Sequence, residues 1–180
     1  MNNKAQKGDT KNRVLKILVP ILIVAVVWAI WFFKNDNKAP ATTDSNPDFA
    51  LHVTEELDLE QLKSYELPIM IDFGADSCIP CKEMAPILVK LNEDLREKAI
   101  IKFVDVWKYP KLADGYPISL IPTQVFFDKD GNPYIPANPQ ALQINMYSSR
   151  ETNEHVFTTH EGGMTEEMIL TVLKEMGLEE

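Results

Sequence analysis

The sequence contains few residues of the kinds that stabilise small proteins through cross-links or metal ions. Only two of its 180 residues are cysteines, and only three are histidines. Two cysteines form at most one disulfide, so a framework of several disulfides is excluded and the protein must fold by burying apolar side chains. The hydrophobic content of 45% is sufficient for an ordinary core. The length allows one compact domain with an appendage, and no internal repeat is present.

Positive charge is scarce beyond the N-terminal region. The chain has 18 Lys and Arg against 27 Asp and Glu, which gives a formal net charge of −9. Residues 1–33 carry a net charge of +4, so the remainder carries −13. Binding to nucleic acid depends on neutralising phosphates with basic side chains. We therefore expect no nucleic-acid partner.

One long apolar run lies near the N-terminus. It extends from Ile17 to Phe33 with Pro20 as its only interruption, and with Val14 and Leu15 it reaches the roughly 20 residues that cross a bilayer. The basic residues precede it, which predicts a cytoplasmic N-terminus and a domain outside the cytoplasm. A cleaved signal peptide is the alternative, with Ala39-Pro40-Ala41 as its cleavage site, although its apolar region usually has only about 7–15 residues.

These patterns divide the chain into four parts. We expect a basic cytoplasmic segment over 1–13, a transmembrane anchor over 14–33, a polar linker over 34–50 and a domain over 51–180. The protein would thus be a single-pass protein of the cell membrane, bound to the membrane through residues 14–33.

Within the domain, apolar patterns predict alternating strands and helices. The run Ile69–Phe73 is apolar except for Asp72, as expected of a strand covered on both faces. The order β-α-β-α-β-α-β-β-α favours parallel pairing of the first three strands in an α/β fold. An insertion at about 133–154 contains three prolines and little periodicity. The predicted strands are 49–53, 69–73, 100–106, 125–128 and 156–159, and the predicted helices are 58–64, 78–97, 111–114 and 165–177.

The two cysteines occur together as Cys78-Ile79-Pro80-Cys81, where a predicted strand and turn lead into a helix. Free amides at a helix N-terminus stabilise a thiolate, so this position favours a reactive thiol. A structural zinc site needs four ligands, but no second cysteine pair is present, and the histidines lack ligand spacing, so we expect no metal. A purely structural disulfide stays possible, although closing so short a loop gains little chain entropy. The only histidines that could complete a zinc site would be His52, His155 and His160.

Asp72 is a second candidate for chemistry. It lies within the apolar run that precedes the cysteines. Burial raises the pKa of a carboxyl group, which suits a proton acceptor near neutral pH.

The segment 71–86, which contains the cysteines, closely resembles the active-site region of the thioredoxin family. Ile121-Pro122-Thr123 about forty residues later, the Phe126-Phe127 pair, the Gly131 turn, Gly162 and a final helix add to the resemblance. It covers roughly residues 55–130 and 155–178. The resemblance implies a thioredoxin-like fold, in which a central mixed sheet is flanked by helices.

The resemblance also implies roles for individual residues. Cys78 would attack a disulfide, Cys81 would resolve the mixed disulfide, and Asp72 would take a proton from Cys81. Pro122 would follow a cis peptide bond, and the backbone of Ile121 would pair with a substrate. Pro80 would set the turn geometry and redox balance, and Ile79 would offer an apolar contact or restrict access.

The sequence departs from the family at several positions. Gly74 and Ser77 stand where tryptophans are common, which reduces the apolar rim beside Cys78. Counting back from Pro110 puts Phe103 where the family often has a lysine and places Lys102 on the opposite strand face. The proton path from Asp72 would therefore be drier or would use water differently. The insertion at 133–154 would form either a recognition lid or a solvated loop.

These observations predict a membrane-tethered, extracytoplasmic thiol–disulfide oxidoreductase that reduces disulfides in client proteins. It would need no bound cofactor and would receive electrons from a transmembrane thiol-electron transporter. One alternative is an extracytoplasmic oxidase that forms disulfides. A non-catalytic binding module of the same fold is another, although the retention of both cysteines speaks against it.

Overall fold

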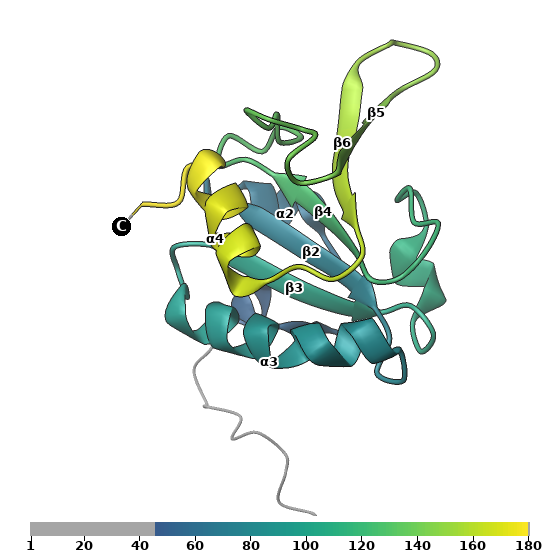
Figure 1. Ribbon diagram of the computed structural model, residues 1–180, viewed down its shortest axis with the longest axis vertical. Helices are drawn as coiled ribbons and strands as arrows, with labels where there is room; N and C mark the ends of the chain where they lie inside the picture. Colours follow the sequence, from purple (N-terminus) through teal and green to yellow (C-terminus); the bar gives the residue numbers. More distant parts are fainter. Residues whose placement is uncertain (1–45, 180) are drawn as a thin grey trace, which may run out of the picture. The chain divides into compact units, whose positions relative to one another are not determined.

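The computed structural model describes residues 46–179 (Figure 1). Its elements, in chain order, are η1 Pro47–Phe49, β1 His52–Val53, α2 Leu59–Lys63, β2 Ile69–Gly74, α3 Ile79–Asp94, β3 Ile100–Asp105, η2 Pro110–Ala113, β4 Thr123–Phe127, β5 Ile144–Ser148, β6 His155–Glu161 and α4 Glu166–Glu175. Within this range, no helix has the length and hydropathy needed to cross a bilayer. The predicted anchor at 14–33 and nearly all of the predicted linker lie outside the described residues.

The strands form one six-stranded sheet in the order β1-β3-β2-β4-β6-β5. The strands β1, β3 and β2 are parallel, whereas β4 is antiparallel to β2 and β6 is antiparallel to β4. The predicted mixed sheet flanked by helices is therefore confirmed. The antiparallel pairing brings the start of β4 and the end of β6 next to the end of β2, where the helix with the cysteines begins.

Helices cover both faces of the sheet, which explains why every residue of β2 is buried. On one face, α3 contributes Met84, Leu88 and Leu91 to a core shared with α4 (Figure 1). On the other face, Phe49 of η1 and Leu62 of α2 pack on the sheet. Burying each large apolar side chain contributes roughly 1.5–3 kcal/mol, so this packing fixes α3, and hence its N-terminus, against the sheet.

The start of α4 follows its predicted capping signal, whereas α3 ends earlier than predicted. Thr165 is the N-cap of α4, and its side chain accepts a hydrogen bond from the Met168 amide. The helix α3 ends at Asp94, three residues before the predicted end, and Glu97 has a φ of 64°. A helix cannot continue through that left-handed backbone, so the apolar pattern overestimated its length.

The insertion contains a strand that the sequence did not predict. The strand β5 pairs with β6 and forms an edge of the sheet, with Ile144 opposite His160 and Tyr147 opposite Phe157. Only Ile144 of this strand is buried. Along β5 the chain runs away from the β4–β6 end that meets the cysteines, and the hairpin extends beyond the sheet (Figure 1). The insertion therefore extends the sheet, and this placement does not support a lid over the cysteines.

Candidate active site

Cys78 and Cys81 lie at the first turn of α3 and form a disulfide, with their Cα atoms 5.3 Å apart. Cys78 is the N-cap residue, and the Cys81 amide points at its sulfur at 3.4 Å. Pro80, which has no amide hydrogen, occupies the first turn, where an amide lacks a helical partner in any case. A sulfur at this position experiences the positive end of the helix dipole, which stabilises its thiolate.

The two cysteines differ in exposure to solvent. Cys78 is 9% exposed and Cys81 is 3% exposed, while Ile79 between them is 72% exposed. An incoming disulfide would therefore meet the Cys78 sulfur first. The exposed Ile79 side chain offers an apolar contact beside it.

Asp72 lies in β2, fully buried, on the sheet face that α3 covers. One of its oxygens, Oδ1, accepts a hydrogen bond of 2.7 Å from the Gln124 side chain. Its Oδ2 has no hydrogen-bond partner among residues 46–179. Desolvation by burial raises the pKa of Asp72 to about 7, although the Gln124 hydrogen bond opposes the shift. A carboxyl group with this pKa can accept and release a proton near neutral pH.

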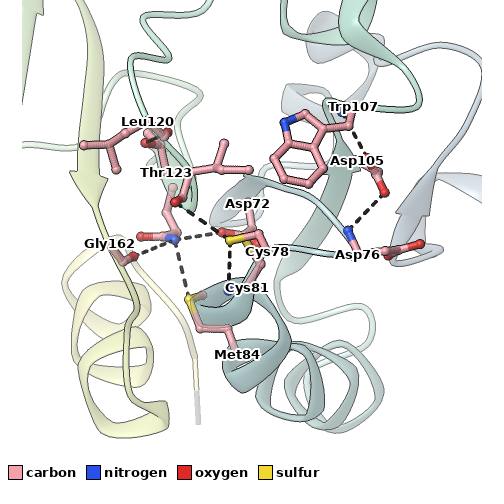
Figure 2. The surroundings of a disulfide bond; sticks show 12 residues. Asp72, Asp76, Cys78, Cys81, Met84, Asp105, Trp107, Leu120, Thr123 and Gly162 are labelled. Atoms are coloured by element: carbon pink, nitrogen blue, oxygen red, sulfur yellow. Dashed lines mark hydrogen bonds between the residues drawn. A yellow bond between two sulfur atoms is a disulfide. The ribbon is translucent and has the colours of Figure 1, made fainter.

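Gly74 leaves open the space between this carboxyl group and the inner cysteine. A Cβ at Gly74 would lie 3.4 Å from Asp72 Oδ2, 3.2 Å from Cys81 Sγ and 2.9 Å from the Phe103 ring. Asp72 and Cys81 therefore approach the same small space (Figure 2). Phe103 borders the same space, so a larger side chain at position 74 would collide with its ring.

The strand register confirms how Phe103 and Lys102 are oriented. Phe103 is the β3 partner of Asp72, whereas Lys102 is the partner of Ile71 and therefore faces the other side of the sheet. A cavity of about 260 Å³ reaches Cys81 beside Phe103, and its other lining residues include Leu51, Ala75 and Leu88. Most of the lining is apolar, and His52, Asp76 and Lys82 also border the cavity.

The predicted cis peptide bond is present between Ile121 and Pro122. The Ile121 carbonyl oxygen lies 3.9 Å from Cys78 Sγ, so this loop faces the outer cysteine. The Gly162 amide donates to the Pro122 carbonyl at 2.8 Å, and the Thr123 hydroxyl donates to the Leu120 carbonyl at 2.7 Å. These bonds hold the loop beside the disulfide.

Asp105, at the end of β3, organises the turn that leads to Cys78. Its carboxylate accepts hydrogen bonds from the backbone amides of Asp76, Trp107 and Lys108. Burial opposes its ionisation, but these donors and the Lys108 charge outweigh burial and lower the pKa of Asp105. Lys108 also pairs with Asp76. No local sequence pattern reveals this network, because Asp76 is 29 residues from Asp105.

Two exposed apolar side chains near the disulfide form a rim that the sequence did not reveal. Trp107 is 63% exposed, and Leu120 is 47% exposed. Both are drawn around the disulfide in Figure 2, where Leu120 precedes the cis loop and Trp107 follows the Asp105 turn. An aromatic side chain from another loop therefore lies near the dithiol, although positions 74 and 77 carry glycine and serine.

Gln124 is another site residue that the sequence did not reveal. It is fully buried, follows the cis loop on β4 and is the strand partner of Asp72. A glutamine after Ile121-Pro122-Thr123 carries no local signal, and only the strand register reveals its contact.

The four residues proposed for client contact are thus gathered around Cys78. Ile79 and Pro80 belong to the first turn of α3, and Ile121 and Pro122 form the facing loop. Among residues 46–179, no group of three or more histidine, cysteine or acidic side chains is arranged to hold a metal ion.

The family comparison agrees with this geometry. A family model described as Thioredoxin matches residues 49–145. A thioredoxin-like protein from Synechocystis is 40% identical over 74 residues, which are 41% of this chain and 70% of the relative. A thioredoxin from Mycoplasmoides gallisepticum is 36% identical over 80 residues, which are 44% of this chain and 78% of the relative.

Two further comparisons define the extent of the similarity. Thioredoxin Y from Oryza sativa subsp. japonica chloroplasts is 37% identical over 91 residues, which are 47% of this chain. The match spans 54% of that relative, so this chain covers about half its length. A mutant thioredoxin from Halobacterium salinarum has the same fold, with a TM-score of 0.51 and 24% identity over 76% of this chain and 97% of that one. The prediction of a thioredoxin-type thiol–disulfide oxidoreductase is supported by these relatives and by the Cys78–Cys81 disulfide.

Proposed function

The chain belongs to the thioredoxin family, and on this premise we propose that its dithiol reduces disulfides in client proteins. The Cys78 thiolate attacks one sulfur of a client disulfide. A mixed disulfide forms, and the other client sulfur leaves as a thiolate. The position of Cys78 at the α3 N-terminus supports this role, because the helix amides stabilise the attacking thiolate.

Cys81 then resolves the mixed disulfide. Its thiol gives a proton to Asp72, and the resulting thiolate attacks the Cys78 sulfur. The second client sulfur is released, so the client disulfide becomes a dithiol while Cys78 and Cys81 become a disulfide. Asp72 Oδ2 and Cys81 Sγ approach the same space at Gly74, which supports this proton transfer.

One observation carries the proposal most directly. The outer and inner sulfurs lie within bonding distance at a helix N-terminus, with a buried carboxyl group behind the inner one. A purely structural disulfide would need neither the capping position nor the buried acid. Burying Asp72 is costly, so its presence favours chemistry over a non-catalytic binding module.

The client would dock across the exposed apolar rim. Ile79, Trp107 and Leu120 present apolar surface around Cys78, and the Ile121–Pro122 loop presents backbone groups. An extended client segment with apolar side chains beside its cysteine fits this surface. Such segments become accessible in incompletely folded proteins.

We further propose that the domain acts outside the cytoplasm, tethered by residues 14–33. The apolar run and its basic N-terminal flank support this arrangement. Because the surroundings there oxidise thiols, a reductase requires a supply of electrons. A transmembrane thiol-electron transporter is the partner we propose for this step.

Trapping of mixed disulfides tests the exchange reaction. In Cys81→Ser the first step proceeds but resolution fails, so disulfide-linked adducts with client proteins should accumulate. Cys78→Ser is the matched control and should trap none. If neither variant yields adducts with a reducible protein such as insulin, a binding module is the better explanation.

The direction of transfer is tested by the reduction potential of the Cys78–Cys81 pair against glutathione mixtures. A reductase should have a potential close to that of thioredoxins, roughly −270 mV. A value near −120 mV, typical of strong oxidants, would favour the disulfide-forming oxidase.

Two experiments test the tether, namely membrane fractionation and protease treatment of intact cells. The full chain should be in the membrane fraction, and external protease should remove the domain. A domain that stays protected, or a chain shortened near Ala41 and released, would contradict the anchor.

A further inference from the structure

A row of strand partners crosses the whole sheet at the level of the dithiol. Partners on adjacent strands project to the same face, so this row faces α3 and α4. Three neighbours near the middle of the row are buried polar residues, which is unusual beneath two helices. The row consists of His52, Phe103, Asp72, Gln124, His160 and Ile144.

Gln124 is the central polar residue of this row. Its side-chain Nε2 donates to Asp72 Oδ1 at 2.7 Å and to the Gly162 carbonyl at 3.2 Å, and it lies 3.6 Å from the Met84 sulfur. The Gly162 carbonyl can only accept, so it fixes which end of the amide faces Asp72. The Gly162 amide in turn donates to the Pro122 carbonyl. Gly162 therefore connects Gln124 to the loop that faces Cys78.

We propose that Gln124 is a positioning residue that orients the Asp72 carboxyl group for proton transfer from Cys81. Its amide occupies Oδ1, so Oδ2 is the oxygen left to carry the proton. Oδ2 borders the space at Gly74 that Cys81 Sγ also borders. Without the amide, the carboxyl group could rotate and its ionised form would lose a donor. This inference rests on the proposed exchange reaction.

The other ionisable groups near Asp72 come from α3, from the neighbouring strands and from α4. Cys81 faces it from α3, and His160 faces the same side from β6, with Nδ1 2.7 Å from the Leu142 carbonyl. The β3 partner is Phe103, and Asp105 lies one pleat further along that strand face. On α4, Glu166 pairs with Lys90, and Glu175 contacts Tyr134. His52, Asp76 and Lys82 border the cavity that reaches Cys81.

The oxidised wild-type protein allows a test without substitution at Gln124. In this form Cys81 cannot titrate, so the side-chain amide NMR signals of Gln124 should shift with the Asp72 titration near pH 7. Asn92 is the internal control, because its buried amide donates only to the Phe49 and Ile101 carbonyls and should not shift. Asp72→Asn should abolish the Gln124 shift. A shift that persists there does not come from Asp72 and would overturn the proposal.

Kinetics of the reduced full-length chain with dithiobis(nitrobenzoate) provide the second test. Attack by Cys78 releases one nitrothiobenzoate, and resolution by Cys81 releases the other. In Gln124→Met, the pKa of Asp72 should rise by about one unit, because its ionised form loses a hydrogen-bond donor. The second release should then slow about fivefold at pH 7, because the ionised fraction of Asp72 falls from about one half to about one tenth, and it should recover at higher pH while the first release is unchanged.

Thr159→Val is the matched control for a buried polar group removed from the neighbouring strand. Thr159 is fully buried and pairs with Val125, on the face away from Asp72. Both releases should match wild type in this variant. If Gln124→Met also matches wild type at every pH, or slows both releases equally, the positioning role is wrong. If wild type itself shows no second release, the proposed exchange reaction fails as well.

Discussion

Two buried charged side chains lie on adjacent strands of this sheet and have opposite arrangements. Lys102, on the α2 face, donates to the Pro47 and Ala50 carbonyls at 3.1 and 2.9 Å. Asp72, on the α3 face, has a donor for only one of its two oxygens. The lysine thus ties the start of the domain to the sheet. The carboxyl group keeps one oxygen open toward the dithiol.

The comparison shows how partners determine the use of a buried charge. Burial lowers the pKa of Lys102 to about 8, which the Asp48 charge partly opposes, and burial raises the pKa of Asp72 to about 7. Lys102 remains mostly protonated at neutral pH and keeps its carbonyl partners. Asp72 is half ionised there, so it is the group that can exchange a proton during a reaction.

The largest expected effect comes from Asp72→Asn, which removes the incompletely paired charge. The folded-state pKa of about 7 lies above the unfolded value of 3.8, so Asp72 favours folding below pH 4 and this benefit is lost as pH rises through 7. At pH 8 the buried carboxylate costs about 3–4 kcal/mol. Chemical denaturation at pH 8 should show Asp72→Asn to be more stable by up to this amount. If the difference in stability between Asp72→Asn and wild type is the same at pH 8 as at pH 4, the account is contradicted.

Lys102→Met should have the opposite sign. The change leaves the Pro47 and Ala50 carbonyls without their donor, which costs about 1–3 kcal/mol for each carbonyl, partly offset by removing a buried charge. We expect a loss of about 1–2 kcal/mol at pH 7, measured by denaturation. Reactivity of the dithiol should stay at the wild-type level, and a large loss would show that the lysine face also serves the site.

The pH dependence of wild-type stability should reflect both groups. The Lys102 pKa is lower in the folded state, so the unfolded chain binds more protons above pH 8 and stability rises with pH from about 8 to 10. Asp72 makes stability fall between pH 4 and 7. Denaturation across this range should therefore show a minimum between about pH 7 and 8, which Asp72→Asn removes on the acid side and Lys102→Met removes on the alkaline side.

Gly74→Ala should have a smaller effect, confined to the Asp72 face. The new Cβ would lie 2.9 Å from the Phe103 ring and 3.2 Å from Cys81 Sγ. We expect a loss of about 1 kcal/mol from this crowding and slower resolution by Cys81. Adding Phe103→Leu should restore part of the lost stability and part of the lost resolution rate. If the double variant is no better than the single one, the contact with Phe103 is not the cause.

Local sequence patterns were sufficient for the dithiol but not for its surroundings. Cys78, Cys81 and the cap of α3 lie within one turn, so the sequence shows them together. Ungapped counting also placed Phe103 beside Asp72 correctly, because β2 and β3 pair without a bulge. Gln124 escaped because it lies 52 residues from Asp72 and meets it only through the β2–β4 register.

The insertion escaped prediction for a different reason. The strand β5 lies at an edge of the sheet and buries only Ile144, so it has no alternating apolar pattern. Its backbone hydrogen bonds to β6 hold it in place, and these leave no signal in the side chains. The place of Trp107 in the rim was likewise not predictable from the sequence, because it depends on the Asp105 turn.

The pH dependence of Cys81 resolution tests the central claim most directly. The release of the second nitrothiobenzoate should be followed in wild type and in Asp72→Asn from pH 5 to 10. If Asp72 accepts the Cys81 proton, the wild-type rate should rise with a midpoint near 7. The variant should lack this step, be at least about tenfold slower at pH 7 and rise only in alkaline solution, as expected for an unassisted thiol. Superimposable profiles for the two proteins would contradict the account.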